Sequence, residues 1–188
     1  MDTSGRAARE EAFARWRVTP PGAILDVMPT GPAARVGDVT AHGGALAPGP
    51  GSTNVLIGGM PAWRGVGAAA AAGIVSSAAA ALGAIMEAQA TATAAAGTPA
   101  GPAAQANLLK TIAEQVAKLS TQMVTTGADN VACPIVKVVI PDGTGVVING
   151  SQTVLIGGFP ACRVGDMIQE VTSVNSIAVG CPTVIIAG

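Results

Sequence analysis

The sequence predicts a mainly β fold, a small β-repeat structure that carries an inserted, alanine-rich α-helical hairpin. Two observations predict this fold. A fourteen-residue segment that begins at Gly51 recurs without gaps at Gly150, 99 residues later, with ten identical residues. Between the two copies the composition changes to long alanine-rich stretches. Each copy of such a repeat can bury its apolar face only against other copies, so we expect the copies to pack together.

The repeat unit combines a short apolar strand with a glycine turn. The first copy contains Val55-Leu-Ile-Gly-Gly59, the second contains Val154-Leu-Ile-Gly-Gly158, and the chain ends on a shorter copy, Gly180-Cys-Pro-Thr-Val-Ile-Ile-Ala-Gly188. Aliphatic runs bounded by turn residues are typical of strands. Because each run is continuous, we expect its side chains to be buried on both faces. Three copies in one chain would form a pseudo-threefold unit that can match a threefold-symmetric partner.

The segment between the copies predicts two antiparallel helices over residues 68–126. No charged residue occurs from Gly65 to Met86, and the alanine-rich character continues to Ala96. Gly97-Thr-Pro-Ala-Gly-Pro102 predicts a turn. The stretch that follows is amphipathic, with apolar residues at helical spacing: Leu108, Leu109, Ile112, Val116, Leu119 and Met123.

Two interpretations of this insertion stay open. The one we favour is a soluble hairpin whose alanine face packs closely on its second helix. A membrane-spanning segment is the alternative, because the uncharged run is long enough to cross a bilayer. Alanine contributes little to membrane insertion, however, and the run also contains glycine and serine.

The remaining segments divide the chain into an arm, a β domain and a return linker. We expect an N-terminal arm at residues 1–28, with a short helix from Ala7 to Arg17 that ends at Pro20-Pro21. The β domain is expected at residues 29–67 and 131–188, with residues 127–130 as the linker that leaves the hairpin. In its second part we expect a strand from Cys133 to Ile140, a turn at Pro141-Asp-Gly-Thr-Gly145 and a strand from Val146 to Ile148.

Charge and cysteine content exclude some classes of function. Charged residues are 11% of the chain, the net charge is -1, and no run of Lys or Arg occurs. Binding of nucleic acid through neutralisation of its phosphates is therefore not expected. Three widely spaced cysteines do not form a disulfide framework. The first residues lack the apolar stretch of a signal peptide, so we expect synthesis in the cytoplasm and no export by that route.

One motif gives a specific resemblance. Pro32-Ala-Ala-Arg-Val-Gly-Asp38, followed by Thr40-Ala-His-Gly-Gly44, together with strands of the form Gly-Ser-x-x-Val-Leu-Ile-Gly-Gly, resembles the PAAR-repeat family. The resemblance covers residues 29–67 and about 131–188. It implies a small, pointed, three-sided β-structure that caps the trimeric spike of a contractile injection system, such as a type VI secretion system or a related phage-tail-like particle.

The same resemblance implies a structural zinc site near the apex. His42, the only histidine, matches the family's histidine after Pro-Ala-Ala-Arg-Val-Gly-Asp, and Cys133 matches the cysteine that opens the loop of the second repeat. The other ligands stay open. Glu170 follows Asp166 by four residues, as His42 follows Asp38, whereas Cys162 and Cys181 are either ligands or small buried residues.

Other residues of the motif have two interpretations. The Arg and Asp residues that recur with it (Arg35, Asp38, Arg163 and Asp166) either pair within the repeat, which we favour, or contact the spike. Trp63 stands where the motif has alanine, and we expect it to pack the base of the hairpin against the β-unit.

The function implied is a non-enzymatic structural tip that caps and sharpens the spike for puncturing a target envelope. Its partner would be a trimeric spike protein, of the valine-glycine-repeat or phage-tail type, and the tip would be expelled with the particle on contraction. The alternative is a membrane-active or effector-docking module of the same machine, which uses the hairpin to engage cargo or a target membrane. One histidine and no Ser-His-Asp arrangement give no support to an enzyme.

Overall fold

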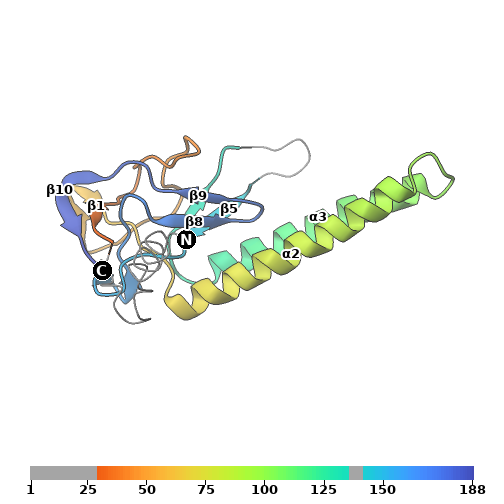
Figure 1. Cartoon of the computed structure of the whole chain (residues 1–188). Coiled ribbons are helices and arrows are strands. Elements are labelled where there is room, and N and C mark those ends of the chain that lie inside the picture. The colour runs from red at the N-terminus through yellow and green to blue at the C-terminus, as the bar shows by residue number, and fades with distance from the viewer. Residues whose placement is uncertain (1–28, 136–141) are drawn as a thin grey trace, which may run out of the picture.

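A computed structural model describes residues 29–135 and 142–188 of the chain (Figure 1). These residues form a β-body of short strands and a long helical hairpin that projects from it. The strands are β1 (Gly31–Ala33), β2 (Leu56–Ile57), β3 (Met60–Pro61), β4 (Asn130–Ala132), β5 (Thr144–Val147), β6 (Leu155–Ile156), β7 (Phe159–Pro160), β8 (Met167–Glu170), β9 (Val174–Ser176) and β10 (Cys181–Ile186). The helices are α2 (Ala68–Ala94) and α3 (Gly101–Val124).

The strands form one four-stranded sheet and three two-stranded pairs. The sheet has the antiparallel order β4-β5-β8-β9, and the pairs are β1-β10, β2-β3 and β6-β7. Gly58 and Gly59 turn the pair β2-β3 with φ of 57° and 82°, and Gly157 and Gly158 turn β6-β7 with φ of 59° and 85°. Two consecutive residues at positive φ are typical of the tight hairpin turn that glycine favours. The pairs β2-β3 and β6-β7 are thus the two full copies of the repeat, and the third pair joins the short copy at the end of the chain, β10, to β1.

A closed ring of backbone hydrogen bonds joins the three copies. The amide of Ala34 donates to the carbonyl of Cys162 at 2.9 Å, Trp63 donates to Ala34 at 2.9 Å, and Cys162 donates to Trp63 at 3.1 Å. A second ring repeats the arrangement two residues away on each segment, with the bonds Val36 to Pro61, Gly65 to Pro160 and Val164 to Pro32. The three segments are therefore related by a pseudo-threefold axis.

Side chains of the apolar triplets alternate between the core and solvent. Ile57, Ile156 and Ile186 are 7%, 6% and 6% exposed and share one apolar cluster with Ala33, Ala62 and Ala161. Their neighbours Leu56, Leu155 and Ile185 are 62%, 58% and 60% exposed. The expectation of burial on both faces is therefore wrong. Only one face of each strand pair packs on the axis, since successive side chains of a strand point to opposite faces.

Trp63 is part of the core of the β-body. It is fully buried and packs in a cluster with Ala34, Leu46, Val131, Val147, Cys162, Ile168 and Ile177. In the circle of backbone hydrogen bonds, Trp63 occupies the position equivalent to Ala34 and Cys162. One large indole side chain therefore fills the space beside two small side chains. The expectation that Trp63 packs the base of the hairpin is wrong, because the cluster that contains the hairpin base does not include it.

In the helical hairpin, α2 packs against α3 mainly through small side chains of α2. Every third or fourth residue of α2 is buried: Ala71, Ile74, Ala78, Ala81, Ile85, Ala88 and Ala92. Their partners on α3 are Leu108, Ile112, Leu119 and Met123. Alanine favours the helical conformation and allows close approach of the two helices. Gly97, with φ of 77°, lies in the turn between them, and Pro102 occupies the first turn of α3, where its missing N–H costs little.

The hairpin has its apolar contacts with the β-body near the start of α2 and the end of α3. Ile74 and Met123 share a cluster with Val146 of β5 and with Val171, next to β8. The cluster further along, around Ile85 and Leu108, contains helix residues only. In Figure 1 the loop between α2 and α3 lies at the opposite end of the molecule from β1 and β10.

By length and composition, α2 is long and apolar enough to cross a membrane. Its most apolar 18 residues have a mean hydropathy of 1.8, and 28% of them are buried in the fold. It also packs a continuous stripe against α3, as a soluble hairpin does.

Some expectations fall on residues outside the described ranges. The N-terminal arm and its helix lie there, as do Val136 to Pro141 of the expected strand and turn. The described part of that strand, Cys133 to Ile135, is not in a strand, whereas β5 agrees with the strand expected at Val146 to Ile148 apart from its ends.

Candidate metal centre

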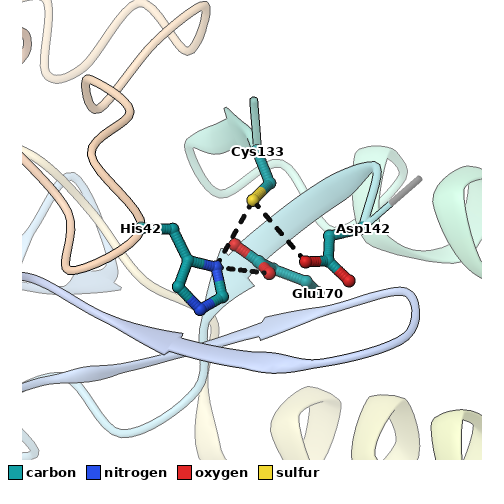
Figure 2. Close-up of side chains that lie close together, drawn as sticks. All are labelled: His42, Cys133, Asp142 and Glu170. Carbon is teal, nitrogen blue, oxygen red and sulfur yellow. Dashed lines mark hydrogen bonds and ion pairs between the residues drawn. The ribbon is translucent and has the colours of Figure 1, made fainter. Parts of the chain in front are cut away.

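His42, Cys133, Asp142 and Glu170 bring their side chains together beside the four-stranded sheet (Figure 2). One donor atom from each of them lies within 4.8 Å of the donor atoms of the other three. Cys133 follows the end of β4, Asp142 precedes β5, and Glu170 ends β8. His42 comes from the loop after the first Pro-Ala-Ala-Arg element, so four separate chain segments meet at this point.

Two separations between donor atoms match the edges of a tetrahedral site. His42 Nδ1 lies 3.4 Å from Cys133 Sγ and 3.2 Å from Glu170 Oε2, and Cys133 Sγ lies 4.0 Å from Asp142 Oδ2. Zinc binds N and O at about 2.0 Å and S at about 2.3 Å, so tetrahedral edges are about 3.3 Å between N and O and about 3.5 Å to S. Two of the three separations fit within about 0.1 Å, and a small movement of Asp142 would bring in the third.

Hydrogen bonds around the cluster hold two of these side chains in place. The Glu170 carboxylate accepts from Ser173 Oγ at 2.5 Å and from Asn175 Nδ2 at 2.8 Å. The side-chain oxygen of the same Asn175 accepts from the backbone amide of His42 at 3.1 Å. Asn175 therefore fixes the loop of His42 relative to Glu170. Partners of this kind orient metal ligands in proteins.

Asp142 is held by Thr172, whose hydroxyl donates to Asp142 Oδ1 at 2.6 Å.

Burial raises the pKa of the Cys133 thiol to about 11, and the neighbouring Glu170 carboxylate adds to the rise, while the backbone amide of Ile135 opposes it. Without a cation the thiol therefore stays protonated at neutral pH, and metal binding would release its proton.

The remaining charges of the described β-body form three Arg–Asp pairs, in each of which the aspartate is buried. Asp38 accepts from Arg35 Nη2 at 2.8 Å, Asp166 accepts from Arg163 Nε at 2.9 Å, and Asp129 accepts from Arg64 Nη2 at 2.9 Å. Each Asp also accepts from the backbone amide of its Arg. The recurring Arg and Asp residues of the motif thus pair within the repeat, as we favoured.

The third pair is split by the hairpin. Arg64 ends a Pro-Ala-x-Arg element equivalent to the other two. The carboxylate that pairs with it belongs to Asp129, which follows α2 and α3 in the sequence.

Glu170 differs from these three aspartates. It is fully buried, and none of its partners in the described ranges is a Lys or Arg side chain. Charges buried in proteins are usually paired with an opposite charge or coordinate a metal. A divalent cation between His42, Cys133, Asp142 and Glu170 would supply that charge, so the donor set fits a metal.

Two cysteines that were open as ligands lie elsewhere. Cys162 is buried on the pseudo-threefold axis beside Trp63, and Cys181 packs near Ala33. Neither belongs to the cluster of donor atoms. The sequence singled out His42 and Cys133 through the resemblance and Glu170 through its spacing from Asp166. It missed Asp142, whose Pro-Asp-Gly context indicates a turn.

Comparison with known proteins gives one match. Residues 139–188 match the family model of the PAAR motif. No curated protein and no solved structure matches the chain. The matched range includes β6, β7 and β10 of the strand pairs and two of the four residues of the cluster, Asp142 and Glu170.

Proposed function

We propose that this chain, whose residues 139–188 match the family model of the PAAR motif, caps and sharpens the trimeric spike of a contractile injection system. On contraction it would be driven with the spike through a target envelope. Its role is then mechanical, carried by shape and rigidity, and it needs no catalytic group.

The observation that carries this proposal is the double ring of backbone hydrogen bonds around one axis. A homotrimeric spike ends in three equivalent subunits, whereas this tip is a single chain. The rings make three chain segments quasi-equivalent, so one polypeptide can offer the same contact to each subunit of the trimer. Closed symmetry of this kind requires matching surfaces on both partners. The three Arg–Asp pairs repeat with the same symmetry and keep the segments in place.

The decisive experiment is assembly with a trimeric spike protein of the same machine. The expected result is a complex with one copy of this chain per trimer, visible by mass measurement in solution and at the spike's end in electron micrographs. A monodisperse chain that binds no spike trimer, tested with spikes from several contractile systems, would contradict the proposal.

We also propose that the four-residue cluster holds a structural zinc ion. His42 and Cys133 would supply the nitrogen and sulfur ligands, and Asp142 and Glu170 would supply oxygen. Four ligands from four segments would cross-link the loops at this end of the body, which increases stiffness at the site. Elemental analysis of the purified protein tests this: about one zinc per chain is expected, and less than a tenth of that in His42→Ala. Wild-type protein without metal, even after zinc is supplied and excess removed, would contradict it.

A second candidate function belongs to the hairpin. It would serve as a membrane-active or effector-docking module of the same machine. Two observations support it: α2 is apolar enough to enter a bilayer, and the distal part of the hairpin has no apolar cluster with the described β-body. Replacing residues 68–126 by a short Gly-Ser linker separates the two roles. If the shortened protein still caps spikes but loses liposome binding or cargo, the hairpin carries the second function.

A further inference from the structure

An apolar groove of about 250 Å³ lies between α2 and the turn that joins β8 to β9. In Figure 1 this turn lies alongside the first half of α2. The groove is lined mainly by Val75, Ala79 and Leu82 of α2 and by Val171 and Val174 at the turn, and none of its lining residues in the described ranges is charged. Pockets for small molecules usually measure about 300–1,000 Å³, so this groove is better suited to one or two side chains.

The groove is the start of a longer apolar stripe on α2. Val75, Leu82 and Met86 follow one another at spacings of seven and four residues, which places them on one face of the helix. They are 42%, 52% and 63% exposed, and Val174 across the groove is 49% exposed. Aliphatic side chains exposed singly are ordinary, whereas a continuous apolar stripe beside a groove indicates an interaction site.

Two aromatic side chains of the chain are available to fill this groove. The chain contains two Trp and two Phe. Trp63 is buried in the core, and Phe159 packs against the cluster at the base of the hairpin. Phe13 and Trp16 belong to the N-terminal arm, where a spacing of three residues places them on one face of the expected helix. Aromatic side chains are effective anchors of such contacts, since each buries about 150–250 Å².

The arm joins the described fold within reach of the groove. Arg163 Nη1 donates to the carbonyl of Pro29, and Arg163 Nη2 donates to the carbonyl of Asn149 at 3.4 Å. The Asn149 side chain accepts from the amide of Met167, the first residue of β8. The groove lies at the other end of β8, about 13 Å away at about 3.3 Å per residue. Twelve residues separate Trp16 from Pro29. An extended chain of that length spans about 40 Å.

We propose that the N-terminal arm, residues 1–28, folds back over this groove and places Phe13 and Trp16 on the apolar stripe of its own chain. The short connection to Pro29 gives the arm an effective concentration in about the millimolar range at the groove, which favours it over a second copy or a foreign helix. The contact covers aliphatic side chains of α2 in the free protein. It is made within one chain, so it depends neither on a spike nor on a metal.

Acrylamide quenching of tryptophan fluorescence tests this contact in the full-length chain. Trp16→Phe leaves the buried Trp63 alone, so the difference from the wild type gives the signal of Trp16. We expect Leu82→Glu and Val174→Glu to release Trp16 to solvent and to raise its quenching constant at least about twofold. The matched control is Leu109→Glu on α3. It replaces a leucine of similar exposure, 49% against 52% for Leu82, that does not line the groove, and it should leave the constant unchanged.

Every outcome decides for or against the contact. The three substituted side chains are about half exposed, so circular dichroism and thermal unfolding should match the wild type and show that the variants fold. The inference is overturned if Trp16 of the wild type is quenched as strongly as in a free peptide of residues 1–28, or if the groove substitutions change nothing. A quenching constant that depends on protein concentration would assign the groove to a second copy. Shielding of Trp16 only after liposomes are added would assign the contact to a bilayer, and either result overturns the inference as well.

Discussion

The split Arg–Asp pair gives a quantitative test of how the insertion is tied to the β-body. Asp129 is fully buried and accepts four hydrogen bonds, from the amides of Gly51 and Arg64 at 3.0 and 2.9 Å and from Arg64 Nε and Nη2 at 3.0 and 2.9 Å. Asp129→Ala removes the acceptor from all four donors. It leaves the Arg64 guanidinium without its carboxylate.

The expected loss follows from the burial of the two partners. Removing one side of a buried ion pair costs about 3–5 kcal/mol. Because the Arg64 side chain is 16% exposed, water can reach part of it, and we expect the lower end, about 3 kcal/mol. For a chain of this size that corresponds to a fall in melting temperature of about 6–12 °C. Asp129→Asn keeps the shape and one acceptor oxygen, so its loss should be smaller, about 2 kcal/mol.

Urea unfolding followed by circular dichroism measures these losses. The control is Glu114→Ala, which breaks the exposed pair with Lys110 at 3.8 Å on α3 and should change the free energy of unfolding by less than about 0.5 kcal/mol. If Asp129→Ala unfolds within 1 kcal/mol of the wild type, about the effect of an ordinary substitution, then the pair does not hold the insertion and the reasoning is refuted.

Other expectations concern the core, the cluster and the hairpin. Trp63→Ala should lose about 3–5 kcal/mol of stability in the same urea assay because it empties the axis, and a loss below 1 kcal/mol would contradict its role there. Glu170→Gln should lower zinc content in elemental analysis more than Glu114→Gln, which lies on the exposed face of α3; equal contents would remove Glu170 from the ligand set. In metal-free protein, alkylation of Cys133 by iodoacetamide should rise with pH towards a midpoint of about 11, since the raised pKa keeps the thiol protonated below it, and a midpoint at or below 9 would refute the burial argument. Replacing residues 68–126 by a Gly-Ser linker should leave a folded β-body by circular dichroism, and an unfolded product would show that the body depends on the hairpin.

The strand pairs and the first helix could be predicted from the sequence because each is encoded by a local pattern of residues. The Val-Leu-Ile-Gly-Gly repeats at Val55 and Val154 predicted the strand pairs, and the uncharged alanine run predicted α2. The alternation of exposure within each triplet was not predicted, because a run of three aliphatic residues has no period from which to read one buried face. Burial depends on how the three copies pack around the axis.

The metal cluster could be predicted only in part from the sequence, because some of its residues are brought together only by contacts between distant segments. His42 and Cys133 carry side chains whose chemistry draws attention, and the structure brings them together with Glu170. Asp142 stands in a sequence that predicts a turn, and only the pairing of β5 with its neighbours carries it to the cluster. The partnership of Arg64 with Asp129 spans the whole insertion, so no local pattern connects the two.

The location of the insertion has a mechanical consequence. The hairpin extends beyond its last apolar contact with the β-body from about Ala81 to Ala94, which at about 1.5 Å per residue is a lever arm of about 20 Å. During the proposed penetration of an envelope, a sideways load on the loop of the hairpin would exert a torque at the base of the hairpin. There Arg64 is bound by Asp129 and lies 5.4 Å from the ring centre of Phe159. The torque would thus pass into a junction that is itself part of the threefold framework, and the whole body would turn with the lever.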